Sequence, residues 1–270
     1  MDNKYLHRED AGFGKGLWDK LDETVTSAAK SRLTGRRLLP VEGPYGPGMK
    51  SIGIMDHAIA GTLSERVRLH IACLLPVPVI ESSFTLSMRD IAAFESNGDA
   101  PGLKAAAGAA MLCADQEDVL VFGGDKNAAL EGLLNFSGVQ KNKLADWKET
   151  GRAVNNILEA VNKLDASGFH GPYALAMAPA RHNLLFRRYP DGTQTELEHL
   201  RQVITGGIIK SHALASEAIL VSAAKELAAI VIGQDLTTSL VGPSGRDYEF
   251  VVFESAALRL SEPASVCVMQ

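Results

Sequence analysis

The sequence predicts an α+β protein, and three observations lead to this fold class. Three long segments, residues 14–33, 103–121 and 145–164, carry apolar residues at helical spacing. Several shorter segments alternate apolar and polar residues, or are brief apolar runs bounded by turn residues, as strands are. Helices and strands follow one another without a regular β-α-β repeat, which argues against a parallel α/β fold.

The composition is that of an ordinary soluble globular chain. Of the 270 residues, 46% are hydrophobic and 22% are charged, and the formal net charge is −5. This charge argues against a general affinity for nucleic acid or anionic lipid. Cys73, Cys113 and Cys267 lie in apolar runs and are expected to be buried thiols. No secretory signal or membrane span is evident, so a cytoplasmic location is expected.

Residues 14–33 are expected to form one amphipathic helix. Apolar residues recur every three or four positions, with charged residues between them. The helix is expected to end before Gly35, because residues 36–48 are rich in proline and glycine and favour extended chain and turns.

Strands are expected at 51–55, 66–72 and 78–86. The first two would form a long hairpin with its turn near Ala60 and Gly61. An isolated two-stranded hairpin is only marginally stable in water. We therefore expect it to lie on another surface, such as a neighbouring subunit.

The rest of the chain is a mixture of helices and strands. The long helices are 103–121, which is rich in alanine, and 145–164. The shorter elements expected are helices at 181–186 and 194–203 and strands at 173–177, 208–210, 218–222, 228–233, 248–254 and 264–269.

No catalytic constellation is complete in the sequence. Glu196 and His199 have the Glu-x-x-His spacing of a di-iron site, but such a site needs two of these motifs and two more carboxylates. We interpret this motif as a solvated helix face and expect no metal and no cofactor. A soluble hydrolase that uses Glu196, Glu198, His199 and His182 is the alternative from a different functional class.

A series of short motifs follows the first helix. The helix is followed by the run from Gly35 to Gly46, GRRLLPVEGPYG. The further motifs are Phe84-Thr85-Leu86, Glu117-Asp118-Val119, Gly132-Leu133-Leu134, Gly171-Pro172-Tyr173, Gly206-Gly207 and Gly233-Gln234-Asp235-Leu236. In this order the motifs resemble those of the encapsulins of family 1, the linocin-like shell proteins of nanocompartments. The resemblance extends from His7 to the C-terminus.

The resemblance implies the Hong Kong-97-type bacteriophage capsid fold. Residues 1–34 would form an inward-facing helix, and 35–132 the peripheral domain, with an extended loop at about 47–76. Residues 133–230 would form the axial domain, whose tip surrounds the five-fold vertex. Residues 231–270 would supply return strands to the peripheral domain and the extended loop.

The function that the resemblance implies is a self-assembling icosahedral shell that encloses a cargo enzyme and passes small solutes through pores. The chain would associate with itself, in sixty or more copies, and with a cargo that carries a C-terminal targeting peptide, such as a ferritin-like protein or a dye-decolourising peroxidase. Neither nucleic acid nor membrane would be a partner. Flavin is not expected, because Arg89 stands where some members have an aromatic residue. A phage major capsid protein is the alternative within the same fold.

The resemblance also implies two sites. A groove at the first helix would bind the cargo peptide, and Pro40 replaces an acidic residue that several relatives carry beside it. Whether the arginines of the five-fold pore loop face the pore or subunit contacts is left open. The groove residues would be Leu17, Leu21, Val25, Ala29, Arg36 and Asp235, and the pore-loop residues Arg187, Arg188, Tyr189, Asp191, Gly192, Thr193 and Gln194.

Overall fold

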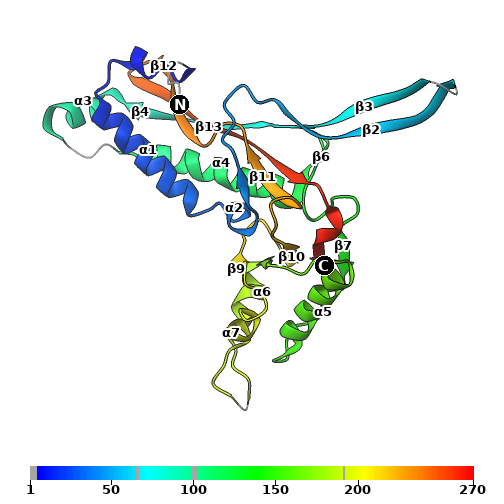
Figure 1. Cartoon of the computed structure of the whole chain (residues 1–270). Coiled ribbons are helices and arrows are strands. Elements are labelled where there is room, and N and C mark those ends of the chain that lie inside the picture. The colour runs from blue at the N-terminus through cyan, green and yellow to red at the C-terminus, as the bar shows by residue number, and fades with distance from the viewer. Residues whose placement is uncertain (1–4, 65–66, 99–101, 191) are drawn as a thin grey trace. The chain divides into compact units, whose positions relative to one another are not determined.

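The computed structural model describes all residues except 1–4, 65–66, 99–101 and 191, and describes side chains outside 55–70. Helices and strands are mixed along the chain, as the sequence predicts for an α+β protein (Figure 1). In the described part of the chain, no helix combines the length and the apolar composition that crossing a membrane requires.

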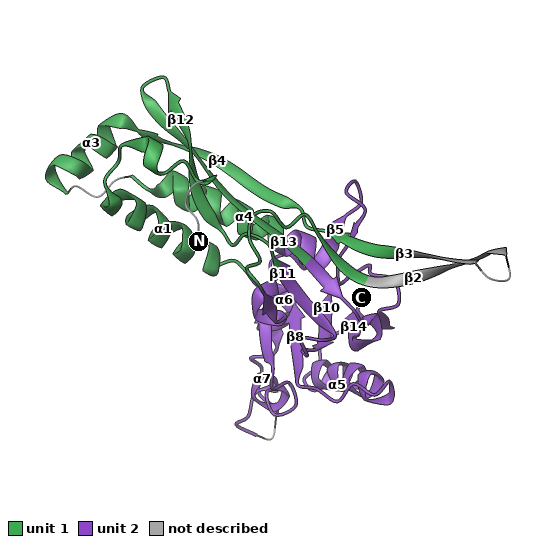
Figure 2. Cartoon of the chain, turned by 45° about the horizontal axis from the view of Figure 1, so that its top comes forward, with its two compact units in different colours: residues 1–33, 43–117, 232–257 green, residues 34–42, 118–231, 258–270 purple. Residues whose placement is uncertain are grey.

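The chain divides into two compact units, each built from three stretches of sequence (Figure 2). Unit 1 holds residues 1–33, 43–117 and 232–257. Unit 2 holds residues 34–42, 118–231 and 258–270.

Unit 1 is built on an antiparallel sheet with an aromatic core. Strand β13 (Asp247–Leu260) lies between β4 (Val79–Ser87) and β12 (Thr237–Ser244), and β12 is an edge strand. Phe84 and Phe250 are paired across β4 and β13 and stack with ring centroids 5.2 Å apart.

Helix α1 (Lys15–Lys30) confirms the helix expected at 14–33 and covers this core. Trp18 meets the ring of Phe250 edge-on at 5.7 Å. Ion pairs of Lys15 with Asp19 and of Lys20 with Glu23 lie on the exposed side. The helix therefore has one apolar face for the core and one charged face for solvent.

The hairpin of β2 (Ser51–Ser64) and β3 (Val67–Pro76) is present and extends away from the rest of unit 1 (Figure 1). Its last paired residues are Ser64 and Val67, so the turn expected near Ala60 and Gly61 was placed too early. Glycine and alanine continue the strand here instead of ending it. Cys73, on β3, is partly exposed, so the expectation of three buried thiols was wrong for this residue.

Two elements of unit 1 were missed by the sequence analysis. Helix α3 (Met88–Asn97) follows β4 directly, and its N-cap is the Ser87 side chain, which accepts the Arg89 N–H at 3.1 Å. Strand β12 contains Pro243, which reads as a turn signal. An edge strand tolerates proline because its outer N–H groups need no strand partner. Helix α4 (Lys104–Gly123), expected at 103–121, begins in unit 1, and its residues from 118 onward belong to unit 2.

Unit 2 contains a five-stranded sheet in the order β7-β14-β10-β8-β9, whose three middle strands are entirely buried. Helix α5 (Arg152–Ala166) packs on the sheet and begins later than the expected residue 145. The preceding segment turns inward instead, where the buried Trp147 indole donates to Asn156 Oδ1 at 3.1 Å. The strands are β7 (Gln140–Asn142), β14 (Val266–Met269), β10 (Ala218–Ser222), β8 (Tyr173–Met177) and β9 (Gly207–Lys210).

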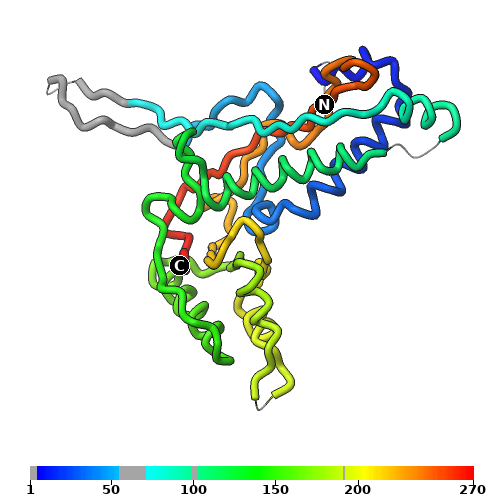
Figure 3. The backbone as a smooth tube through the Cα atoms, turned by 180° about the vertical axis from the view of Figure 1, so that it is seen from behind, coloured from blue at the N-terminus to red at the C-terminus, as the bar shows by residue number. Residues whose placement is uncertain are grey.

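The remaining elements of unit 2 are short. In Figure 3, α5 (green) and the segment that holds α6 and α7 (yellow-green) extend from the same end of this unit. Strands β1 and β11 pair in parallel. The elements are α2 (Gly35–Leu38), β1 (Val41–Glu42), β5 (Gly124–Asp125), β6 (Leu130–Glu131), α6 (Pro179–Leu184), α7 (Glu196–Leu200), β11 (Ala228–Ile232) and a 3-10 turn (Pro263–Ser265).

Candidate functional site

Unit 1 contains a small crevice where three segments meet: residues 5–12, helix α1 and the start of β12. The crevice holds a cavity of about 240 Å³. Apolar walls come from one residue of each segment, and polar side chains surround them. The lining residues are Leu6, Val25 and Leu236, with Arg8, Asp22, Thr26 and Thr237.

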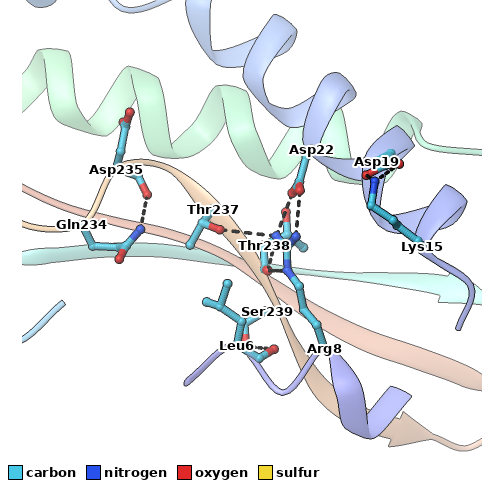
Figure 4. A network of polar contacts seen from close by, with 10 residues as sticks. All are labelled: Leu6, Arg8, Lys15, Asp19, Asp22, Gln234, Asp235, Thr237, Thr238 and Ser239. Atoms are coloured by element: carbon cyan, nitrogen blue, oxygen red, sulfur yellow. Dashed lines mark hydrogen bonds and ion pairs between the residues drawn. The ribbon is translucent and has the colours of Figure 1, made fainter. Parts of the chain in front are cut away.

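Ion pairing holds these segments together (Figure 4). The Arg8 guanidinium donates to both carboxylate oxygens of Asp22 on α1 at 2.7 Å. It also donates to the backbone oxygen of Thr238 on β12. The walls of the cavity are thus fixed by the same side chain that lies beside it. Sequence analysis missed Arg8, since no spacing rule connects it with either partner.

The residues expected to bind a cargo peptide lie in different environments. Leu17, Leu21, Val25 and Ala29 are all buried in the core of unit 1, and Val25, although only 1% exposed, is also part of the cavity wall. The fifth and sixth candidates are Arg36, which lies in α2 and belongs to unit 2, and Asp235, which is exposed next to the cavity residue Leu236.

The expected pore loop is a tight connection between α6 and α7 in unit 2, and its base is held by an ion pair. Arg187 donates from Nη2 to Glu196 Oε2 at 3.0 Å and from Nη1 to the Lys148 backbone oxygen at 2.7 Å. The other Glu196 oxygen accepts the Gly151 N–H at 2.8 Å. Arg187 is therefore committed to contacts inside its own unit.

The tip of this loop is exposed. The Arg188 side chain is exposed, as are Gly192, Thr193 and Gln194. Tyr189 turns back, and its hydroxyl lies 2.8 Å from Nδ1 of His199. The remaining candidate, Asp191, lies outside the described residues.

The structure corrects the interpretation of the Glu-x-x-His motif as a solvated helix face. Glu196 is 0% exposed, because its carboxylate is enclosed by Arg187 and the Gly151 N–H. Glu198 does face solvent, where it forms a capping box with Thr195. No group of three or more metal-binding side chains is found among the described residues.

The two buried thiols are poor nucleophiles. Burial raises the pKa of Cys113 to about 12, with a smaller contribution from the carboxylates of Glu254 and Glu81. Burial likewise raises the pKa of Cys267 to about 11. Neither thiol is ionised near neutral pH, and the thiolate is the reactive form.

Comparison with known proteins shows relatives over nearly the whole chain. The chain is 32% identical to the type 1 encapsulin shell protein EncA of Myxococcus xanthus, over 94% of this chain and 92% of that protein. It is 28% identical to a diheme-cytochrome–encapsulin shell fusion protein of Kuenenia stuttgartiensis, over 97% of this chain and 74% of that protein. A ferritin-like–encapsulin shell fusion protein of Pyrococcus furiosus is 25% identical over 72% of this chain and 53% of that protein.

Solved structures confirm the Hong Kong-97-type capsid fold. The virus-like particle from Pyrococcus furiosus has a TM-score of 0.74 at 23% identity and covers 94% of this chain and 99% of its own. The capsid of the myovirus XM1 has a TM-score of 0.61 at 14% identity and covers 88% of this chain and 91% of its own. Capsids and encapsulins share this fold, so the fold alone does not separate them. The two are separated by the family model described as "Encapsulating protein for peroxidase", which matches residues 1–257. The chain is therefore a shell protein of the encapsulin family.

Proposed function

We propose that this shell protein retains a cargo protein by binding a short apolar tail of the cargo at the crevice of unit 1. The observation that carries the proposal is the cavity of about 240 Å³ with Leu6, Val25 and Leu236 as its apolar walls. Pockets for drug-sized ligands span roughly 300–1,000 Å³. A smaller one with apolar walls fits a single aliphatic side chain.

Weak binding at one cavity is enough for such a role. Every copy of the chain in a shell presents the same crevice, so a cargo with several tails is held by many contacts at once. Linked sites raise the overall avidity far above the affinity of one site. A tail with one or two aliphatic anchors therefore suffices.

We propose a redox or iron-handling protein as the cargo, and no catalytic role for the shell protein itself. Two relatives are fused to a diheme cytochrome and to a ferritin-like protein, and the family description names a peroxidase. Of the four residues that would make a hydrolase, three form structural hydrogen bonds instead, and the fourth, His182, packs against the Phe186 ring. Glu196 pairs with Arg187, Glu198 caps α7 and His199 meets Tyr189.

The proposal is tested with a fluorescent reporter protein that ends in a Gly-Ser tail containing two leucines, produced together with the shell protein. Reporter with the leucine tail should be recovered in purified particles, and reporter whose leucines are replaced by serine should not. Equal recovery of both reporters would refute docking through apolar side chains.

A matched pair of shell variants locates the docking site. Thr26 is exposed at the cavity, and Ser27 is exposed next to it without lining the cavity. Thr26→Trp should block entry of the leucine and lower reporter recovery at least several-fold, whereas Ser27→Trp should leave recovery unchanged. Loss of recovery in both variants would place the site elsewhere on α1.

We also propose that the loop from Arg187 to Glu196 lines a pore in the assembled shell, with Arg188 as its charged side chain. Arg188 is exposed, while Arg187 is engaged with Glu196 and Lys148. Repetition around an axis multiplies one charge and biases which ions pass. Arg188→Glu should reverse the preference between anionic and cationic quenchers of an enclosed fluorophore, and Arg187→Lys should not reverse it.

A further inference from the structure

The N-terminal segment of unit 1, residues 5–12, is attached to the rest of the unit at an open sheet edge. Strand β12 pairs with β13 on one side only. On the other side, the backbone oxygen of Leu6 accepts the Leu240 N–H at 3.1 Å and the Ser239 hydroxyl at 2.9 Å. The segment thus covers an edge that would otherwise expose unpaired backbone groups.

Arg8 provides the second attachment, and its guanidinium contacts four partners at once, one of which is the Thr237 hydroxyl at 3.4 Å (Figure 4). Both terminal nitrogens contact Asp22 at 2.7 Å, in a bidentate pair. Nε and Nη2 donate to the Thr238 backbone oxygen at 3.1 and 2.9 Å. The guanidinium carbon lies 4.8 Å from the centre of the Trp18 ring. The Arg8 side chain is 12% exposed and Asp22 is 45% exposed, so solvent screens the carboxylate of the pair more than the guanidinium.

The position of Arg8 divides the surface beside α1 into two cavities. Arg8 lines the cavity of about 240 Å³ together with Leu6 and Val25. It also lines a neighbouring cavity of about 430 Å³, together with Phe13 and Trp18. One side chain therefore forms the common wall of both.

We propose that Arg8 is a positioning residue for cargo docking: by fastening residues 5–12 to α1 and β12, it builds the aliphatic pocket that receives the cargo tail. This inference rests on the proposed function. Leu6 reaches the pocket from the N-terminal segment, and Leu236 and Val25 reach it from the elements to which Arg8 fastens that segment. We call the contacts of Arg8 with Asp22 and Thr238 the latch. Without the latch, the pocket loses the apolar wall that Leu6 provides and its boundary with the second cavity.

The chemistry of the latch requires arginine and not merely a positive charge. A guanidinium is planar and can pair with both oxygens of a carboxylate while it stacks on an aromatic ring. Lysine offers a point charge that can keep the attraction to Asp22 but cannot hold Asp22, Thr238 and the Trp18 face together. A lysine variant should therefore restore docking only in part.

The experiment uses assembled shells with the leucine-tail and serine-tail reporters described above. The variants are Arg8→Ala, Arg8→Lys and Asp22→Asn, and the control is Lys20→Ala. Lys20 is exposed on the same helix, pairs with Glu23 and does not line either cavity. Affinity for the tail is measured by titrating each shell with the free fluorescein-labelled leucine peptide. Hydrogen exchange of the Leu240 amide reports whether residues 5–12 are still attached.

We expect Arg8→Ala to lower the affinity for the leucine peptide at least ten-fold and to speed hydrogen exchange of the Leu240 amide. Particle yield and melting temperature should match those of Lys20→Ala. Arg8→Lys and Asp22→Asn should lie between Arg8→Ala and the wild type. If Arg8→Ala prevents particle formation, Asp22→Asn becomes the deciding variant.

Unchanged affinity together with faster exchange at Leu240 would overturn this inference, because the segment would then be detached without effect on the pocket. The proposed function would still stand in that case. If wild-type shells bind the leucine and serine peptides equally, both the proposed function and this inference fail. The two failures are therefore distinguishable.

Discussion

Asp118 shows how one buried carboxylate can organise the backbone of unit 2. It is 4% exposed and accepts the N–H groups of Thr34, at 2.9 and 3.0 Å, and of Gly35, at 2.8 Å. The Thr34 hydroxyl also donates to it and lies 2.7 Å from the Ser211 hydroxyl. These are donors that the first turn of α2 cannot satisfy within the helix. Asp118 belongs to the motif Glu117-Asp118-Val119, which carried part of the family resemblance, and these hydrogen bonds explain why an aspartate stands at this position.

Replacing Asp118 with alanine should destabilise the protein by about 2–3 kcal/mol, because buried donors lose a charged acceptor. Asp118→Asn keeps one carbonyl oxygen and should cost less. Guanidinium chloride unfolding, followed by tryptophan fluorescence, measures the difference. Asp115→Ala is the control, since this half-exposed residue lies 4.0 Å from Arg32. Its effect should be within about 0.5 kcal/mol, and a loss as large as that of Asp118→Ala would contradict the argument.

His182 should make the stability of unit 2 depend on pH. Burial lowers its pKa below the ordinary value of 6.5, and the charges of Lys210 and Arg201 lower it further. Its Nδ1 atom is buried and has no hydrogen-bond partner within the described part of the chain, and its ring meets Phe186 edge-on at 5.7 Å. Above pH 6.5 the imidazole is neutral in both the folded and unfolded states. Below it, the unfolded state binds the proton first, so stability falls until the pH reaches the folded pKa.

The measurement is the melting temperature of the wild type and of His182→Gln between pH 7.5 and 5. The difference between the two at pH 7.5 is the baseline. As the pH falls below 6.5, the wild type should lose stability faster than the variant. Parallel curves over the whole range would show that His182 does not titrate differently in the folded state.

At the scale of elements, the periodicity of apolar residues correctly predicted the helices that local sequence determines. It missed the helix start and the strand that depend on contacts with residues distant in the sequence. Helices α1 and α4 lie where the apolar spacing placed them. The start of α5 was misplaced because Trp147 is apolar at helical spacing, yet its indole is held by Asn156 in a turn. Strand β12 was missed because Pro243 reads as a turn. Only the edge position of β12 in the sheet makes proline acceptable there.

The candidate sites also contain features that depend on residues distant in the sequence, which neither motifs nor spacing could indicate. Resemblance to the family proposed the first helix and the 187–194 loop as the places of the two candidate sites. It did not show that Arg187 is used internally, because its partners Glu196 and Lys148 come from other segments. Nor could spacing separate Val25 from Leu21: both lie on one helical face, and only the neighbouring segments decide which one reaches a cavity.

The conformation of the loop between α6 and α7 should be stabilised by the ion pair of Arg187 and Glu196 at its base. Arg187 is 27% exposed and Glu196 is 0% exposed. Removing one partner of a buried pair leaves an uncompensated charge and costs about 3–5 kcal/mol. Because Arg187 is partly solvated and glutamine can still accept the Gly151 N–H, we expect Glu196→Gln to cost about 2 kcal/mol. Amide exchange should become faster at Gly151, whose N–H donates to Glu196, and at Tyr189, whose N–H donates to the Gln194 backbone oxygen.

The control for this prediction is Glu198→Gln, two residues along the same helix. Glu198 is exposed, and the hydrogen bonds found for its side chain in the described part of the chain are those of the capping box with Thr195. Its replacement should loosen the first turn of α7 and leave exchange at Gly151 unchanged. If both variants speed exchange at Gly151 equally, the ion pair does not hold the base of the loop.

At the scale of the whole molecule, the hairpin of β2 and β3 points to assembly. Ile71 is 49% exposed and Leu74 is 59% exposed on a two-stranded sheet. Large apolar side chains that are exposed on a two-stranded hairpin are stabilising only when another surface covers them. In a shell protein, the available surface is a neighbouring copy of the chain. The hairpin is therefore expected to be an intersubunit contact.

Cys73 lies on the same face of β3 as Ile71, two residues away, and supplies a direct test of this contact. In assembled wild-type particles, iodoacetamide should modify Cys73 slowly, whereas in the Ile71→Asp variant assembly should fail and Cys73 should react at least ten-fold faster. Cys113 and Cys267 act as internal standards: burial raises the pKa of the first to about 12 and of the second to about 11, so both should stay unmodified until the chain unfolds. Ile71→Leu, which conserves the volume of the side chain, should assemble and protect Cys73 like the wild type. If Ile71→Asp still forms particles in which Cys73 reacts no faster than in the wild type, the hairpin does not contribute the contact, and assembly must depend on other surfaces of the two units.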